Sequence, residues 1–420
     1  MRNPQGIPYV LTIALLLHLS ACQFVHSPTF IPDTISTTQT DPASFPSTQE
    51  SMPIPTLSSE TSPTELKLEN PAGPMVLFVT SDPCLVKAVS VNGGDAITLT
   101  SNPPIYDCWR PKFSPDGKKL AFILMDGQYD LYVMNLDGSG LTRVADAMAF
   151  AWSPDSSQLV YKTNDPETQI GRIEITTING DNAHGIGYQD VSICTTCDAD
   201  IDLSWSPDGE WIYSPADLDF PDSGFFTANI FKVDGSMHSQ LSPNDISIFT
   251  AAAWSPNSQR AALPILKPEN GCGELHIMAS EGAAQIIRAD NAYKKGEPGI
   301  SPSCFNLASS TWSSDGSTIV ASGYPQGNFA TGAILFERIL LVSPATQKVD
   351  ILEYWPGHPG SFLWSPDGAN IVFTASPDLA SSGSADGPIV IMKNNLEFAE
   401  YSVLDQKVKN SPGAIYWLEN

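Results

Sequence analysis

Three aspartates alternate in the segment CDADIDLSW, at Asp198, Asp200 and Asp202. Alternate side chains of an extended backbone point to the same side, so these three carboxylates would converge. Calcium prefers hard oxygen ligands of this kind, although the segment lacks the glycine and the terminal glutamate of an EF-hand loop. An acidic rim is the favoured interpretation, a Ca²⁺ site is the alternative, and we expect no other cofactor.

The first of the seven cysteines, Cys22, points to lipid modification. It ends the segment LSAC, which follows a short apolar run from about Tyr9 to Leu17. A run of this length is too short to span a membrane and is typical of an export signal. LSAC resembles the bacterial lipobox, whose cysteine becomes the lipidated N-terminus of the mature protein. The alternative is an ordinary signal peptide with an incidental cysteine.

The other six cysteines form an even set, which predicts disulfides in an exported protein. Cys84 stands just before a predicted strand and Cys108 just after the next one, and Cys272 and Cys304 repeat that placement. In an antiparallel sheet, both positions of each pair fall at the same edge. We therefore pair Cys84 with Cys108 and Cys272 with Cys304.

Cys194 and Cys197, in the segment ICTTC, are then paired by exclusion. A redox site and a zinc site are the alternatives for a CxxC segment. The chain has no second CxxC or nearby histidine cluster that would complete a zinc site, and no thioredoxin-like βαβ setting. A disulfide that closes a tight loop is the favoured interpretation.

Signatures of common catalytic sites are missing from the chain. GxSxG, HExxH, GxGxxG and GxxxxGK[ST] do not occur. The four histidines after the N-terminal region stand apart, at His184, His238, His276 and His358. Isolated histidines are more often surface or hydrogen-bonded core residues than catalytic ones. We therefore predict that the protein is not an enzyme.

The sequence repeats a short motif that must position any site. WSPDG occurs at 205–209 and at 364–368, and near-copies begin at Phe113, Trp152, Trp254 and Trp312. The aromatic residues are separated by 39, 53, 49, 58 and 52 residues, and one further step of 53 reaches Trp417 near the C-terminus. A period near fifty residues predicts stacked or radial repeats.

Each motif is followed by residues typical of a β-hairpin and then of two further strands, so each repeat predicts a four-stranded antiparallel unit. In SPDG, proline suits the first central turn position and glycine the left-handed one. Ser156 and Ser258 replace that glycine, and Ser314 replaces the proline. One such unit cannot bury both faces, so we expect radial blades with the aromatic residue in the wedge between neighbours.

The two ends of the chain complete one blade. AIYWLEN is a first strand with no second, whereas 75–81, 85–91 and 96–100 are second, third and fourth strands with no first. Closure removes the open sheet edges of the ring. We therefore predict an all-β, seven-bladed β-propeller over residues 75–420, closed by pairing of its N- and C-terminal strands.

The repeated WSPDG, followed by an IVF-like strand and a VMNLDGSG-like hairpin, resembles the propeller repeats of the TolB-like family, which also cap prolyl oligopeptidases. The resemblance implies the fold. It does not select a function, because propellers of this type serve as binding platforms, lids and occasionally enzymes.

The segment 23–74 is rich in serine, threonine and proline and has no hydrophobic period. Such a composition does not fold and predicts a tether that follows the signal peptide at 1–22. The formal charge of −25 opposes binding to nucleic acid and to anionic lipid. We expect a monomer, exported and anchored to a bacterial membrane only through its N-terminal lipid.

Long connections are predicted at one edge of the ring, near 186–201, 214–229, 288–309, 322–332 and 374–387. Long loops on a rigid scaffold often bind partners. The aromatic residues in or near them define a candidate binding face that consists of Phe220, Phe225, Phe226, Tyr324, Phe329, Tyr354 and Trp355. The alternative is that these side chains tuck beneath their own loops.

Two functions remain open. The favoured one is a non-catalytic binding platform that engages a protein or a cell-envelope glycan through the long-loop face. The alternative is a propeller enzyme that acts on carbohydrate as a lyase or hydrolase, for which paired acids or a metal cluster should converge at the central channel.

Overall fold

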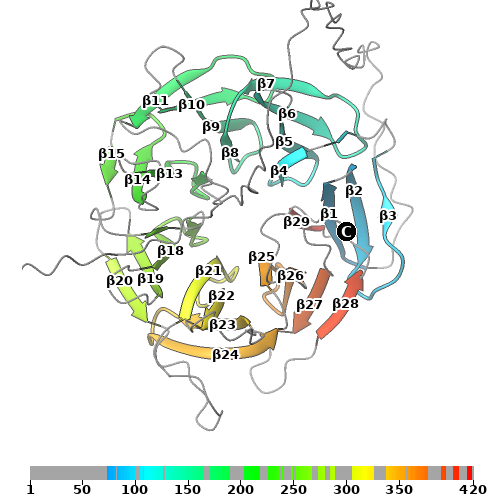
Figure 1. Ribbon diagram of the computed structural model, residues 1–420, viewed down its shortest axis with the longest axis vertical. Coiled ribbons are helices and arrows are strands. Elements are labelled where there is room, and N and C mark those ends of the chain that lie inside the picture. The colour runs from blue at the N-terminus through cyan, green and yellow to red at the C-terminus, as the bar shows by residue number, and fades with distance from the viewer. Residues whose placement is uncertain are drawn as a thin grey trace, which may run out of the picture. The chain divides into compact units, whose positions relative to one another are not determined.

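The computed structural model describes 73–81, 83–100, 105–106, 108–125, 128–164, 171–189, 203–217, 226–236, 238–240, 247–248, 252–266, 273–279, 284–288, 305–325, 337–355, 358–376, 389–393, 401–405 and 414–418. These residues form strands and turns, and within these ranges no helix is long and apolar enough to cross a membrane. The strands build seven antiparallel sheets, which stand as blades around a ring (Figure 1).

Both ends of the described chain contribute to blade 1. From the centre outward its strands are β29 (Ile415–Leu418), β1 (Met75–Ser81), β2 (Cys84–Ser90) and β3 (Ile97–Thr98). The predicted ring closure is therefore confirmed.

Blades 2 to 4 each follow the chain from the inner to the outer strand. Blade 2 consists of β4 (Cys108–Phe113), β5 (Lys119–Met125), β6 (Tyr129–Asn135) and β7 (Thr142–Asp146). Blade 3 consists of β8 (Ala149–Trp152), β9 (Gln158–Asn164), β10 (Gly171–Thr177) and β11 (His184–Gln189). Blade 4 consists of β12 (Ser204–Trp205), β13 (Trp211–Asp217), β14 (Phe226–Lys232) and β15 (His238–Gln240).

Blades 5 to 7 complete the ring. In blade 5 the inner strand is split into β16 (Ser247–Ile248) and β17 (Ala253–Trp254), which both pair with β18 (Arg260–Leu266), and β19 (Gly273–Ala279) and β20 (Ala284–Arg288) follow. Blade 6 consists of β21 (Phe305–Trp312), β22 (Ile319–Pro325), β23 (Glu337–Ser343) and β24 (Lys348–Trp355). Blade 7 consists of β25 (His358–Trp364), β26 (Asn370–Ser376), β27 (Ile389–Lys393) and β28 (Tyr401–Asp405).

The register of the innermost pair of strands is the same in every blade. Trp152 lies opposite Leu159, and Trp364 lies opposite Ile371. In the blade closed by the two ends, Trp417 lies opposite Val76. The C-terminal strand therefore occupies the position that the WSPDG strand occupies in the other blades.

The apolar core consists of layers between blades. The buried apolar side chains in the described ranges fall into seven clusters, and each cluster draws on two consecutive blades. Alternation along a strand explains this arrangement, because successive side chains point to opposite neighbours. In β5, for example, Leu120 packs toward blade 1 and Ala121 toward blade 3. The motif aromatics lie in or against these layers, as the sequence predicted.

The serine of the motif, to which the sequence analysis gave no role, organises each turn. In the turn of blade 3, Ser153 is buried, and its hydroxyl donates to Asp155 Oδ1 at 2.7 Å and accepts from the Gln158 N–H at 2.9 Å. The same two bonds recur in the other five turns, with an asparagine oxygen in place of the carboxylate in blade 5. The repeated motif therefore encodes a buried hydroxyl as well as a turn.

The two turns that lack glycine keep the same geometry. Ser156 has a φ of 64° and Ser258 a φ of 58°, compared with 67° at Gly117. Each serine hydroxyl accepts a hydrogen bond from the preceding blade: the Asp116 N–H donates to Ser156 at 3.0 Å and the Asp208 N–H to Ser258 at 2.8 Å. The positive φ at each of these serines is therefore accompanied by a hydrogen bond between blades.

Candidate functional site

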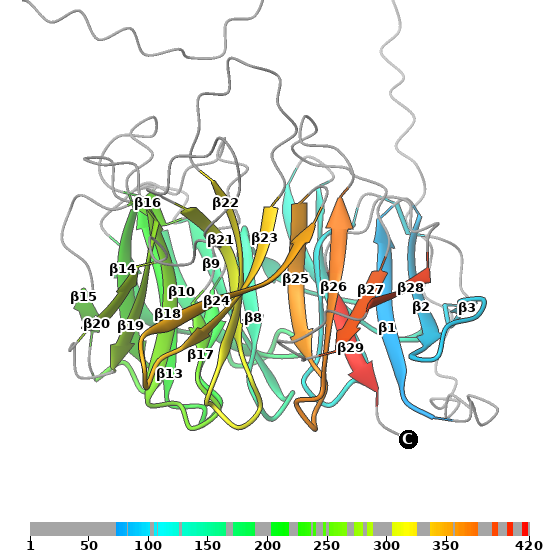
Figure 2. The same cartoon turned by 90° about the horizontal axis from the view of Figure 1, so that it is seen from below.

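The ring has two different edges, which Figure 2 shows from the side. The six motif turns lie at one edge, which we call the turn edge. By antiparallel connectivity, β13, β22 and β26 end and β14, β23 and β27 begin at the opposite edge, which we call the far edge. The described strand ends at this edge border the long connections that the sequence predicts.

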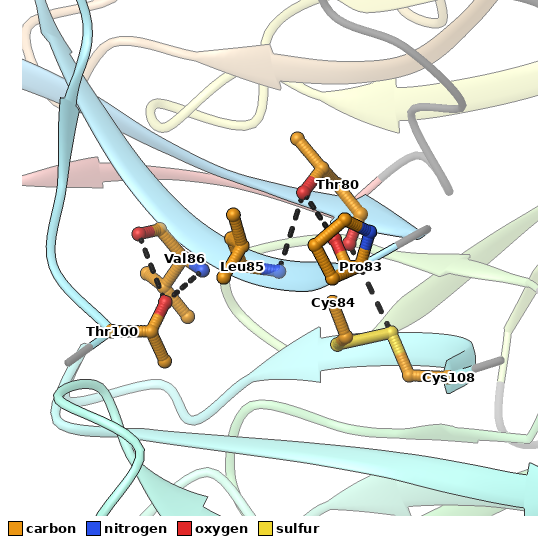
Figure 3. The surroundings of a disulfide bond; sticks show 7 residues. All are labelled: Thr80, Pro83, Cys84, Leu85, Val86, Thr100 and Cys108. Atoms are coloured by element: carbon orange, nitrogen blue, oxygen red, sulfur yellow. Dashed lines mark hydrogen bonds between the residues drawn. A yellow bond between two sulfur atoms is a disulfide. The ribbon is translucent and has the colours of Figure 1, made fainter. Parts of the chain in front are cut away.

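Cys84 and Cys108 form the predicted disulfide, which lies at the far edge (Figure 3). Their Cα atoms are 5.8 Å apart, and the two side chains are 1% and 4% exposed. Cys84 begins β2 and Cys108 begins β4, so the bond joins blade 1 to blade 2. It thus fastens the blade that closes the ring to its neighbour.

Hydrogen bonds hold the chain around this disulfide (Figure 3). The Thr80 hydroxyl donates to the Pro83 carbonyl at 2.6 Å and accepts from the Leu85 N–H at 3.2 Å. On the other side of β2, the Val86 N–H donates to the Thr100 hydroxyl at 2.8 Å. Both threonines satisfy backbone groups where strands end, so the bonded cysteines sit in a fixed frame.

The other proposed lipid, disulfide and metal positions lie outside the described residues. They are Cys22, Cys194, Cys197, Cys272, Cys304, Asp198, Asp200 and Asp202. Phe220, Phe225 and Phe329 of the candidate binding face also lie there.

The remaining four aromatics of that face belong to strands, because several strands extend further than the sequence predicted. Phe226 begins β14, Tyr324 lies in β22, and Tyr354 and Trp355 end β24. All four positions are at or near the far edge, since each strand starts or finishes there. The structure therefore places these residues at the predicted edge, distributed over blades 4 and 6.

A different cluster of aromatic residues lies at the far edge of blade 2. The ring of Trp109 in β4 is 5.9 Å from the ring of Tyr129 in β6, at an interplanar angle of 48°. The guanidinium carbon of Arg110 lies 4.2 Å from the centre of the Trp109 ring. Met125 at the end of β5 is 51% exposed and pairs with Tyr129 across the strands. We call Trp109, Arg110, Met125 and Tyr129 the blade 2 cluster.

The backbone is strained within this cluster. Arg110 has a φ of 51°, and it sits in a bulge where the register of β4 against β5 shifts between Trp109 and Lys112. Ser361, in the corresponding bulge of β25, has a φ of 34°. Bulges turn side chains out of the regular alternation, and strained non-glycine residues concentrate at functional sites. The inner strands of blades 2 and 7, on either side of blade 1, are thus irregular toward the far edge.

A group of charged side chains lies on β6 and β7 of blade 2. Arg143 donates to Asp130 Oδ1 from Nε at 3.0 Å and from Nη2 at 2.7 Å, and it also contacts Asp146. Burial and the neighbouring Asp130 carboxylate raise the pKa of Asp146. The hydrogen bond to Asp130 raises the pKa of Arg143. This edge of blade 2 therefore presents both signs of charge on a chain whose total is −25.

A second polar group lies in blade 5. Glu274, 2% exposed, is 2.8 Å from His276 Nε2 through Oε2 and 2.9 Å from Arg288 Nε through Oε1. Glu274 and His276 both lie in β19, and their side chains point to the layer shared with blade 4, where Met278 packs. The histidine is thus a hydrogen-bonded core residue, as expected for an isolated one. His184 begins β11 and is exposed, while the side chains of His238 and His358 are not described.

Carboxylates are absent from the described inner strands, namely CWRPKF, AFAW, SW, SI, AW, FNLASSTW, HPGSFLW and IYWL. Three or more metal-ligating side chains do not come together anywhere in the part of the chain that the structure describes. The sequence did not predict the blade 2 cluster, because its long predicted connections lie in other blades. The signal that could have found it is CWR, which places an aromatic and a cation directly after a cysteine predicted at the far edge.

Comparison with known proteins adds a fold likeness. No protein-family model matches the chain. The periplasmic gluconolactonase of Pseudomonas aeruginosa is similar at 13% identity with a TM-score of 0.53, over 82% of this chain and 99% of that one. Prolyl oligopeptidase B from Galerina marginata is similar at 13% identity and a TM-score of 0.52, over 81% of this chain and 52% of that one.

TolB from Acinetobacter baumannii is also similar, at 17% identity with a TM-score of 0.44, over 81% of this chain and 82% of that one. Likenesses at these identities describe the fold and leave activity open. The register, the seven apolar layers and the repeated turns together identify the chain as a seven-bladed β-propeller, whose repeated motif resembles that of the TolB-like family.

Proposed function

We propose that this chain is a non-catalytic binding platform outside the cytoplasm. It is held to a bacterial membrane by lipid on Cys22 and by the tether 23–74, and it engages a protein or a cell-envelope glycan through the far edge. The observation that carries the proposal is the blade 2 cluster, in which three neighbouring strands bring together an aromatic pair, a guanidinium on a residue of positive φ and an exposed methionine.

The chemistry of that cluster supports contact with a partner. Tryptophan, tyrosine and arginine are enriched among the residues that dominate binding energy at interfaces. Aromatic rings can also stack on sugar rings. Rigid layers between blades hold these groups in place, which lowers the entropy lost on binding.

The disulfide supports the location. Buried structural disulfides persist in oxidising compartments and are rare in the bacterial cytoplasm. The bond between Cys84 and Cys108 fastens the closing blade, so its formation outside the cytoplasm would favour completion of the ring there.

Fractionation tests the anchor. We expect Cys22→Ser to move the protein from the membrane fraction to the soluble exported fraction. Membrane association that is unchanged in this variant would contradict lipidation at Cys22.

Binding assays test the platform. The full chain is incubated with solubilised envelope proteins in one arm and with purified cell-wall polymer in the other, and retained material is quantified. We expect the double variant Trp109→Ala, Tyr129→Ala to lose at least tenfold in binding in one arm. The matched control is Ile286→Ala in blade 5, which removes an apolar side chain that is 43% exposed outside the cluster. Equal binding by the cluster variant and the control would contradict the assignment.

The same samples address the enzyme alternative. Incubation with the polymer is followed by assay of released soluble sugar. A platform binds without release, whereas release that requires the folded chain would favour a carbohydrate-active propeller.

A further inference from the structure

Indole groups link neighbouring blades at three joints of the ring. The Trp152 N–H donates to the Lys112 carbonyl at 3.0 Å, and the Trp312 N–H donates to the Ala253 carbonyl at 2.8 Å. The Trp364 N–H lies 3.4 Å from the Thr311 carbonyl. In each case the acceptor is the residue before the motif aromatic of the preceding blade. A regular ring would therefore place the indole N–H of Trp254 against the backbone carbonyl of Ser204.

The joint between blades 4 and 5 departs from this pattern. The indole Nε1 of Trp254 is buried and has no hydrogen-bond partner within the described residues. The same is true of the hydroxyl groups of Ser204 and Tyr213. Ser204 and Tyr213 are register partners in β12 and β13, and Tyr213 packs in the same cluster as Trp254. The three polar side chains therefore face one layer.

Tyr213 is particular to this joint. In the chain, Tyr213 comes directly after the residue that pairs with the motif aromatic of its blade. Its side chain points toward the next blade. In the other six blades this position carries an aliphatic side chain, at Leu77, Ala121, Val160, Ala262, Val320 and Val372. Tyr213 is fully buried, and it brings a hydroxyl into the layer between blades 4 and 5. Burial raises the pKa of Tyr213, so the hydroxyl stays protonated and remains a donor at physiological pH.

Buried polar groups in folded proteins have hydrogen-bond partners, and ordered water supplies them where protein groups do not. The three groups fit water well. An indole N–H can only donate, whereas the two hydroxyls can donate and accept. A water molecule could accept from Trp254 or Tyr213 and donate to Ser204.

We propose that the joint between blades 4 and 5 is a buried hydration site, in which ordered water bonds to Ser204, Tyr213 and Trp254. The site belongs to the scaffold and is independent of the proposed binding function. This joint therefore differs from the three joints at which an indole N–H bonds directly to a backbone carbonyl of the preceding blade.

Substitution of the tyrosine tests the site. In the full-length protein, Tyr213→Phe removes a hydroxyl that bonds to water, so we expect the melting temperature to fall by about 2 °C. The matched control is Tyr161→Phe in blade 3, whose hydroxyl donates to Glu174 Oε2 at 2.6 Å and whose loss should also lower the melting temperature. If Tyr213→Phe melts at or above the temperature of the unsubstituted protein, the hydroxyl has no partner and the proposal is overturned.

Crystallography provides a second readout that does not depend on stability. At a resolution that shows ordered solvent, we expect a density peak within about 3.2 Å of at least two of the three polar atoms. A joint without such a peak, in a map that shows buried water elsewhere, overturns the proposal even if the variant is destabilised.

Discussion

The hydroxyl of Tyr416 donates a 2.8 Å hydrogen bond to the carbonyl oxygen of Pro115, 301 residues earlier in the chain. Tyr416 lies in the C-terminal strand of blade 1, and Pro115 lies in the first turn of blade 2. The Tyr416 ring also lies 5.9 Å from the ring of Phe113. The last strand therefore fastens the ring in two directions, by pairing with β1 and by side-chain contact with the next blade.

Gly117 should tolerate no side chain because of this contact. A Cβ at Gly117 would lie 2.5 Å from Tyr416 Cε1, and its φ is 67°. We expect Gly117→Ala to lower the free energy of unfolding by about 2 to 4 kcal/mol, from overpacking and from positive φ. The measurement is urea denaturation. Gly209→Ala is the control, because its φ is 77° but its Cβ would meet only Pro154 Cγ at 3.6 Å. Equal losses in the two variants would show that Tyr416 does not restrict Gly117.

Removal of residues 411–420 should open the ring. The truncation takes away β29 and exposes one edge of β1. It also removes the Tyr416 ring that lies beside Phe113. We expect the truncated protein to aggregate or to melt far below the intact one. A melting temperature equal to that of the full chain would contradict closure by β29.

Single substitutions of the motif tryptophans should each cause a smaller loss of stability than this truncation. Trp364 is 6% exposed, so Trp364→Ala should lower the free energy of unfolding by about 3 to 5 kcal/mol. Trp417 packs only partly buried against the layer between blades 7 and 1, so Trp417→Ala should have a smaller effect. A larger loss at Trp417 than at Trp364 would contradict this order.

At Ser156, the energetic cost of the positive φ and the hydrogen bond that its hydroxyl accepts should have opposite effects on stability. Ser156→Ala keeps the positive φ but removes the acceptor of the Asp116 N–H, so we expect a loss of about 1 kcal/mol. Ser156→Gly removes the same bond but relieves the strained φ, which offsets about 1 kcal/mol. Denaturation midpoints should therefore rank Ser156→Gly above Ser156→Ala. The reverse order would mean that φ carries no strain here.

The disulfide between Cys84 and Cys108 should stabilise the closing blade. It spans a sequence separation of 24 residues, so Cys84→Ser with Cys108→Ser should lower the free energy of unfolding by about 3 kcal/mol. Peptide mapping without reduction should recover the two cysteines in one linked peptide. The same map tests the predicted bonds between Cys272 and Cys304 and between Cys194 and Cys197, and free thiols at these positions would contradict them.

Acid should weaken the motif turns. The hydroxyls of Ser153, Ser313 and Ser365, together with backbone N–H groups, donate to carboxylates and hold the pKa values of Asp155, Asp315 and Asp367 below their usual range. A carboxyl whose pKa is lower in the folded state stabilises the fold above its unfolded value of about 3.9. That contribution is lost as pH falls through the folded value.

The turn of blade 5 already carries the substitution that can test this contribution. Asn257 replaces the aspartate there and still accepts from the Ser255 hydroxyl at 2.8 Å. We expect the triple variant Asp155→Asn, Asp315→Asn, Asp367→Asn to keep most of its stability at pH 7. Its melting temperature should fall less steeply than that of the unsubstituted protein below about pH 4. Identical profiles in acid would show that these carboxyls do not contribute.

The repeat in the sequence determined the architecture. Spacing of the motif aromatics predicted seven blades, and the unmatched strands at 75–100 and at the C-terminus predicted ring closure, which the pairing of Val76 with Trp417 confirms. These features were predictable because they depend on hydrophobic alternation and turn chemistry within each repeat. The pairing of Cys84 with Cys108 was predictable for the same reason, since strand direction alone places both at one edge.

Contacts between blades were decided only by the tertiary structure. The blade 2 cluster forms because a bulge at Arg110 brings a guanidinium over Trp109, while Tyr129 arrives from a strand two places outward. The unusual joint at Tyr213 exists because a side chain on one blade meets Trp254 on the next. The sequence repeats one local pattern in every blade, so it could not show which blade departs from it. That depends on how non-equivalent side chains fill each wedge, and a wedge is formed by residues far apart in the chain.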